Sequence, residues 1–153
     1  MLIILSVSLH VKPDITSGGF PGDARPCYAR GMVPGVTRID HIQIAAPAGC
    51  EQAAREFYGG ILGLKEIEKP AALQARGGCW FECGDQQLHV GVEPDFRPAK
   101  KAHPAFAVVG FDRLRETLAQ CGIVLTDESI PGTRRFYADD PSGNRLEFVE
   151  GVS

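Results

Sequence analysis

The sequence predicts an α+β fold built from two βαβββ modules, whose sheets pair into one curved, mixed sheet with the helices on its outer face. Three observations predict it. From residue 36 onward, strand and helix patterns follow the order βαβββ, and this order occurs twice. Each unit has only about 50 residues, too few for a good core, so the two should pack together. Glycine and proline are more frequent in the first 35 residues, where they number nine, than in the remaining 118, where they number 20, so the fold should lie in the later part.

The composition narrows the class of protein. The chain has 153 residues, with 16 Lys and Arg against 19 Asp and Glu, so its net charge is -3 and it lacks the basic excess of nucleic-acid-binding proteins. Its apolar start, Met1–Leu9, is shorter than the roughly 20 residues of a membrane span. Five cysteines fit neither zinc-finger spacing nor a disulfide framework. We therefore expect a cytoplasmic protein with reduced thiols and a small-molecule partner, without nucleic acid or membrane.

Residues 1–35 are predicted to be a disordered or mis-called N-terminal extension, because glycines and prolines interrupt any regular element there. The second methionine, Met32, stands just before the periodic pattern begins. We hypothesise that Met32 is the natural start, and that a single domain spans residues 36–150.

Module one is predicted over residues 36–95. A strand rich in isoleucine comes first, and a helix follows that should stop at Gly59-Gly60. Three further strands are separated by Pro70, by Gly77-Gly78 and by Gly84-Asp85. In order, the elements are Arg38–Ala46, the helix Cys50–Tyr58, and Leu64–Glu68, Cys79–Cys83 and Gln87–Glu93.

Module two is predicted over residues 100–150 and repeats this order. Its amphipathic helix should end at Gly122, and a turn is expected at residues 140–143 (DPSG). The elements are the strand His103–Val109, the helix Asp112–Cys121, and the strands Ile123–Glu128, Arg134–Ala138 and Asn144–Glu150.

Four metal-ligand types occupy paired positions of the repeat. His41 and His103 lie in the first strand of each half, and His89 and Glu147 lie in the last. The separations are similar, 48 residues in the first half and 44 in the second. Because side chains two apart share a strand face, each candidate shares its face with polar or small residues, opposite bulky apolar ones. We expect the bulky face to pack on the helices and the other face to line a cavity.

Any one of these histidines alone is more often a hydrogen-bonded or surface residue than a ligand. Their joint placement changes the balance, because three of the four histidines in the chain and one carboxylate fall on the same predicted face. Neutral imidazole and carboxylate suit Zn, Ni, Fe, Mn or Co. The residues therefore predict a shared metal site.

A series of motifs carries a family resemblance. They are residues 40–42 (DHI), 57–58 (FY) with 61–64 (ILGL), 103–106 (HPAF) and 140–147 (DPSGNRLE). In this order and spacing they resemble the vicinal oxygen chelate superfamily, which includes glyoxalase I, bleomycin- and fosfomycin-resistance proteins and extradiol dioxygenases. The resemblance covers about residues 36–150.

The resemblance implies a cup around a divalent ion (nickel, zinc, manganese or iron), usually in a homodimer. His41, His103 and Glu147 match the shared ligand positions, and His89 matches a fourth, usually Glu in glyoxalase I. It implies a glyoxalase I-like lyase or isomerase, in which the ion stabilises an enediolate on a small substrate with vicinal oxygens and Glu147 moves the proton. A weaker alternative base is Glu93, on the His89 face.

Two positions depart from glyoxalase I. Ala45 and Glu93 stand where those enzymes commonly carry an Arg and an Asn for glutathione. A carboxylate there would repel the charged ends of glutathione, so we do not expect glutathione dependence.

Substrate-binding candidates share the ligand face or adjoin it. Arg134, Arg135 and Arg145 could bind an anionic substrate, and Arg145 is the best candidate because it shares the face of Glu147. Gln43 shares the face of His41, and Trp80 could wall the cavity, although a strand aromatic more often belongs to the core. Two alternatives stay open: an extradiol-type dioxygenase using Fe(II), and a non-enzymatic binding or resistance protein.

Overall fold

A computed structural model of the chain describes residues 35–128 and 130–151. The described residues from Ile39 onward belong to one compact unit. The predicted extension, up to residue 34, and the hypothetical start at Met32 lie outside the described residues. Within the described part of the chain, no helix has the length and apolar character needed to cross a membrane.

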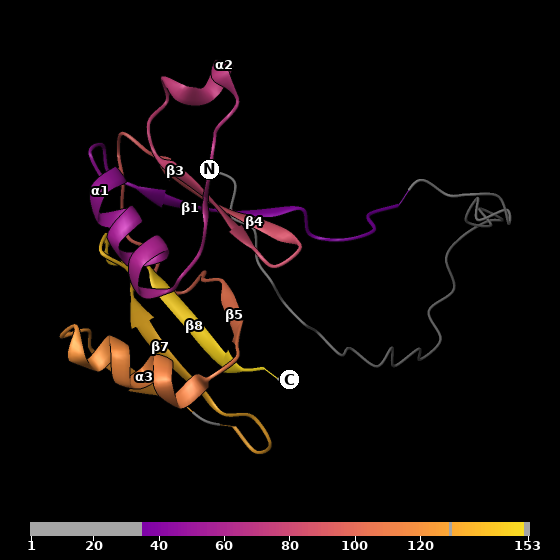
Figure 1. The fold of residues 1–153 in the computed structure, drawn as a ribbon, viewed down its shortest axis with the longest axis vertical. Helices are drawn as coiled ribbons and strands as arrows, with labels where there is room; N and C mark the ends of the chain where they lie inside the picture. Colours follow the sequence, from indigo (N-terminus) through magenta and orange to yellow (C-terminus); the bar gives the residue numbers. More distant parts are fainter. Residues whose placement is uncertain (1–34, 129, 152–153) are drawn as a thin grey trace, which may run out of the picture. The chain divides into compact units, whose positions relative to one another are not determined.

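Module one forms a four-stranded sheet in the order β1-β4-β3-β2 (Figure 1). The pair β1 and β4 is parallel, and the other two pairs are antiparallel. Its elements are β1 His41–Ala46, α1 Glu51–Ala54, the π-helix η1 Arg55–Ile61, β2 Glu66–Ile67, α2 Ala71–Gln74, β3 Cys79–Cys83 and β4 Gln86–Val92.

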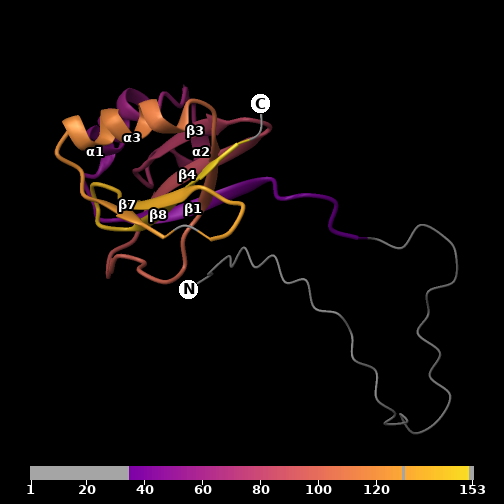
Figure 2. The same cartoon turned by 90° about the horizontal axis from the view of Figure 1, so that it is seen from below.

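Module two repeats this topology in the sheet β5-β8-β7-β6, again with a parallel first pair. Its helix α3 lies across β7 and β8 (Figure 2), where Phe111 packs edge-on against Phe136. Its elements are β5 Ala105–Val108, α3 Phe111–Gln120, β6 Leu125–Asp127, β7 Arg135–Asp139 and β8 Arg145–Glu150.

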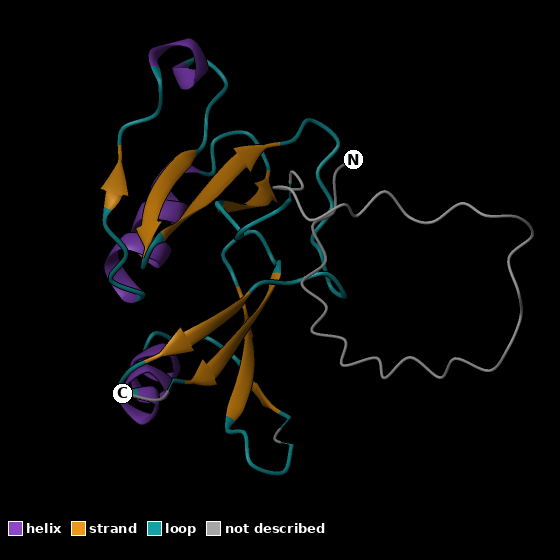
Figure 3. Cartoon of the chain, turned by 90° about the vertical axis from the view of Figure 1, so that its right-hand side faces the viewer, coloured by secondary structure: helices purple, strands orange, loops and turns teal. Residues whose placement is uncertain are grey.

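The α+β class and the paired modules are confirmed. Hydrogen bonding keeps the strands in two groups (Figure 3), and no ladder joins the two sheets within the described residues. In each sheet one face is buried and the other is open, as the alternation predicts. Ile44 and Leu88 of module one belong to the same hydrophobic core as Leu146 and Phe148 of module two. The opposite face of each sheet carries the polar side chains.

The first helix differs from the prediction, because Gly59-Gly60 does not end it. The chain continues as the π-helix η1 to Ile61, and Leu62 N donates to Phe57 O at 2.9 Å. Phe57 and Tyr58 are buried there, and Tyr58 packs against Phe81 with ring centroids 5.7 Å apart. Tertiary burial of two aromatic rings outweighs the conformational cost of the glycines.

Two smaller differences concern an additional helix and the start of a strand. The short helix α2 was not predicted. The strand predicted from His103 begins only at Ala105, because Pro104 has no N–H to give to a ladder. Pro104 still accepts a hydrogen bond from Glu147 N at 3.0 Å, which keeps His103 beside β8.

The turn after β7 ties the two modules together. Buried Asp140 accepts from Tyr58 Oη of module one at 2.8 Å and from Asn144 Nδ2 at 2.9 Å. Asn144 Nδ2 also donates to Ala45 O of β1, and Asn144 Oδ1 accepts from Ala99 N, both at 2.9 Å. The predicted turn is therefore present, and its polar side chains form a buried junction that the sequence pattern did not reveal.

Candidate metal and substrate site

The open face of module one presents two stacked imidazoles. His41 on β1 and His89 on β4 lie with ring centroids 4.4 Å apart. Trp80 on β3 covers the other side of His89 at 3.7 Å, with the two rings nearly parallel at 4°. His89 is therefore buried on a face that is otherwise open, and the His41 side chain is 44% exposed.

Burial keeps His89 neutral. Desolvation, followed by the neighbouring His41, lowers the pKa of His89 to about 4. His89 Nε2 lies 2.9 Å from Gln87 Oε1, and His41 Nδ1 lies 3.0 Å from Asp40 Oδ1. If each of these nitrogens donates to its oxygen, the other nitrogen of the ring carries a lone pair that can bind a metal ion, the arrangement typical of metal-ligating histidines.

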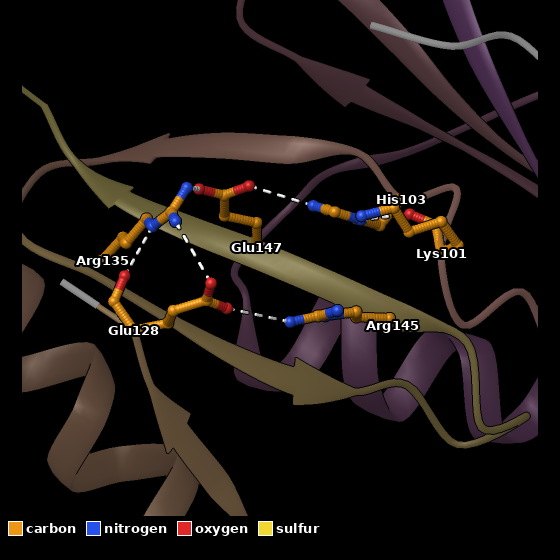
Figure 4. A network of polar contacts seen from close by, with 6 residues as sticks. All are labelled: Lys101, His103, Glu128, Arg135, Arg145 and Glu147. Carbon is orange, nitrogen blue, oxygen red and sulfur yellow. Dashed lines mark hydrogen bonds and ion pairs between the residues drawn. The ribbon is translucent and has the colours of Figure 1, made fainter. Parts of the chain in front are cut away.

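The open face of module two presents a histidine and a carboxylate (Figure 4). His103 Nε2 lies 3.0 Å from Glu147 Oε2, and His103 Nδ1 lies 2.8 Å from the Lys101 carbonyl. If Nδ1 donates to this carbonyl, neutral His103 turns a lone pair toward the carboxylate. A cation, either a proton or a metal ion, is then needed between them.

Strand register shows that the two pairs are equivalent. In module one His89 is opposite Gln43, two residues after His41. In module two Glu147 is opposite Ala105, two residues after His103. An aromatic residue faces each partner from the antiparallel strand, Trp80 beside His89 and Tyr137 beside Glu147. The structure thus brings the predicted ligands together in two pairs at matching positions.

The four side chains do not converge within one chain. Among residues 35–128 and 130–151, no group of three or more His, Cys, Asp or Glu side chains is close enough to hold a metal ion. Imidazole and carboxylate are donor types that suit a divalent first-row ion, and each module presents one pair of them.

The predicted substrate-binding residues are all on the open faces. Arg145 on β8 places its guanidinium carbon 3.8 Å from the Tyr137 ring centroid. The exposed Gln43 side chain lies over Gly91, where an added Cβ would come within 2.9 Å of Gln43 Nε2. Trp80 stacks on His89 rather than entering the core, where Phe81 lies instead. Glu93, the alternative base, is exposed beyond the end of β4.

Arg135, which the sequence ranked below Arg145, lies beside the predicted base. Its Nη1 lies 3.0 Å from Glu147 Oε1, so this arginine contacts the predicted base directly. Arg135 and Tyr137 are two apart and share a face, but only the register reveals that Tyr137 is opposite Glu147. Arg134 points to the other side and pairs with Asp112 and Glu150.

A cavity of about 590 Å³ lies between the first helix of module one and the strands of module two, next to the predicted substrate-binding residue Arg145. Phe57 and Ile61 line it from η1, and Tyr137 and Arg145 line it from module two. It does not include His41, His89, His103 or Glu147.

Two βαβββ modules, with pairs of potential metal ligands at equivalent positions, define a recognisable class of fold. Residues 38–148 match the family model of the Glyoxalase/Bleomycin resistance protein/Dioxygenase superfamily. The chain belongs to this superfamily.

Solved structures agree. A protein from Bacillus anthracis described as a glyoxalase family protein is 51% identical, with a TM-score of 0.75, over 79% of this chain and 100% of that one. Lactoylglutathione lyase from Agrobacterium tumefaciens is 20% identical, with a TM-score of 0.62, over 77% and 96% of the two chains. A glyoxalase/dioxygenase from Nostoc punctiforme is 24% identical, with a TM-score of 0.63, over 91% and 99%. The last two likenesses concern the fold alone. No curated protein matches the chain.

Proposed function

We propose that this chain is a metal-dependent enzyme of the lyase or isomerase type, acting on a small substrate with two adjacent oxygens. The observation that carries the proposal is the equivalence of the two donor pairs. Each pair is placed by the same strand register, and each histidine has at least one ring nitrogen beside an oxygen. We assign His41, His89, His103 and Glu147 as ligands within a single domain over residues 36–150.

A homodimer would complete the site. Each chain offers two half-sets of ligands that do not meet within the described residues. Closed dimers can join different surfaces of two identical chains, so module one of one copy would face module two of its partner. Two such sites would form in each dimer.

The residues of this chain have distinct roles in the proposal. The bound ion would supply Lewis-acid stabilisation of charge on the two substrate oxygens. Glu147 would move a proton between adjacent carbons, and Arg135 at 3.0 Å would hold its carboxylate in place. Trp80 would fix the His89 ring by stacking at 3.7 Å. With Ala45 and Glu93 near the site, glutathione would not be the substrate.

The state of the cysteines supports a cytoplasmic location. Cys50, Cys79, Cys83 and Cys121 are free. Burial raises the pKa of Cys79 to about 11, which keeps this thiol protonated and unreactive. Free thiols suit a reducing compartment, which supports the expectation of a cytoplasmic protein.

A complementation experiment tests the site and the dimer together. Protein with both His41→Ala and His89→Ala, and protein with both His103→Ala and Glu147→Gln, should each lose bound metal by elemental analysis. After the two are unfolded, mixed in equal amounts and refolded, roughly a quarter of the wild-type metal per chain should return. Half of the dimers would then be mixed, each with one intact site.

The controls define what contradicts the proposal. Glu93→Gln should retain wild-type metal content, because Glu93 is exposed beyond β4. Wild-type metal content in both double variants would refute the ligand assignment. If the variants lose metal and the mixture regains none, the proposed dimeric site is wrong. Turnover of a catechol under oxygen, without turnover of a hemithioacetal, would favour the dioxygenase alternative.

A further inference from the structure

We propose that Arg135 and Arg145 form a clamp for the carboxylate of the substrate, and that Glu128 of the same chain occupies this clamp until the substrate replaces it. The substrate would be a small carboxylic acid with a second oxygen on the adjacent carbon. The second oxygen rests on the proposed function, whereas the binding of a carboxylate by the two arginines does not.

Two arginines from neighbouring strands meet one carboxylate (Figure 4). Arg145 Nη2 donates to Glu128 Oε2 at 3.4 Å, and Arg135 Nη2 lies 3.7 Å from Glu128 Oε1. Each guanidinium therefore faces a different oxygen of the same carboxylate. This is the arrangement that a planar anion with two oxygens would use.

Both arginines are held in place without the help of the Glu128 carboxylate. The Arg145 guanidinium lies over Tyr137, and its side chain is 28% exposed. Arg135 is fixed by Glu147 and by the Glu128 carbonyl, which accepts from Arg135 Nε at 2.6 Å. A ligand carboxylate would therefore find two ordered donors, which lowers the entropic cost of binding.

The carboxylate of Glu128 is easy to displace. Its side chain is 57% exposed and lies beyond the end of β6. Its contacts at 3.4 and 3.7 Å are longer than good charge-assisted hydrogen bonds, so solvent competes with them. The occupant already present is a carboxylate, which favours a carboxylic acid over a phosphate as the ligand.

The clamp also places the ligand next to the proposed base. Arg135 contacts Glu128 through one nitrogen and Glu147 through another, so an acid bound in the clamp would lie beside the Glu147 carboxylate. Its adjacent carbon and second oxygen would then face the site formed by Glu147 and His103.

Binding of lactate to the metal-free protein tests the clamp. In EDTA and at constant ionic strength, lactate, lactamide and inorganic phosphate are titrated into nitrogen-15-labelled full-length protein, and amide and arginine Nε shifts are followed by NMR. Lactate should shift Arg135 and Arg145, whereas neutral lactamide should not, and phosphate should bind more weakly.

Variants separate the clamp from general charge effects. Glu128→Gln should tighten lactate binding about threefold to tenfold, because it removes the internal competitor. Arg145→Gln should weaken it at least about fivefold. Arg134→Gln is the matched control, because it removes the same charge from the other face and should change the affinity by less than about twofold. Circular dichroism verifies that each variant is folded.

Three outcomes would overturn the clamp: an unchanged lactate affinity in Glu128→Gln, an equal loss in Arg134→Gln and Arg145→Gln, or tighter binding of phosphate than of lactate. Because EDTA removes metal, these results are independent of the complementation experiment. If lactate binds as expected but the mixed variants regain no metal, the clamp stands and the proposed dimeric metal site is wrong. If the mixed variants regain metal but lactate does not bind as expected, the metal site stands and the clamp is wrong.

Discussion

The two modules share a topology but differ in the chemistry of their open faces. In module one the donor pair is two imidazoles, packed between Trp80 and solvent with no carboxylate in the pair. In module two the pair is His103 with Glu147, joined by Arg135 in a network of charges. The register that places both pairs is the same, so the difference comes from side chains alone.

This difference indicates how a duplicated unit can supply unlike halves of one site. Because burial keeps His89 neutral, its ring can stack on His41 at 4.4 Å without repulsion between two imidazolium charges. On the other face Glu147, with a side chain 11% exposed, pairs with Arg135 at 3.0 Å. One module would thus contribute neutral donors, and the other would contribute the charge, the proton carrier and the anion clamp.

The largest expected loss of stability comes from the buried junction around Asn144, which joins the two modules. Asn144→Ala should lower the free energy of unfolding by about 3–4 kcal/mol, because Ala45 O, Ala99 N and Asp140 Oδ2 each lose a hydrogen-bond partner. Urea denaturation measures the change. Ser142→Ala, in the same turn, should cost less than about 0.5 kcal/mol. Equal stability of the two variants would mean that the junction does not couple the modules.

Replacing one donor side chain on each face compares the two modules directly. In EDTA, Glu147→Gln should cost about 2–3 kcal/mol, because the mostly buried Arg135 then keeps only its longer ion pair with the exposed Glu128 carboxylate. His89→Phe should cost less than about 1 kcal/mol, because a phenyl ring keeps the stack with Trp80. Urea denaturation at pH 7 compares them. A larger cost for His89→Phe would show that module one also depends on polar contacts.

The pH dependence of module one is the smallest of these effects. The pKa of folded His89 is about 4, below its ordinary value of 6.5, so the unfolded state binds the proton more readily. Stability from this group is present at neutral pH and is lost as pH falls from 6.5 toward 4. Between pH 7 and pH 5 the loss should be about 2 kcal/mol. Thermal denaturation should show this loss in the wild type, and His89→Phe should remove it.

Much of the fold was predictable because the sequence pattern is local. Alternation along residues 41–46 correctly assigned Ile44 and Ala46 to the buried face and His41 to the open face. The prediction was wrong where packing decides. Gly59-Gly60 should have ended the first helix, but buried Phe57 and Tyr58 carry the chain through as a π-helix. The assignment of His41, His89, His103 and Glu147 as metal ligands stays a prediction.

The sequence by itself determined the repeat, the faces of the strands and the residues from which a site can be built, because strand periodicity depends only on neighbours along the chain. Only the tertiary structure decided which of those residues meet. Arg135 contacts Glu147, Glu128 lies between two arginines, and Asn144 joins the modules, since contacts across strands depend on register and on turns. The same dependence separates the four ligand candidates into two pairs, which leads to the proposal of a second copy.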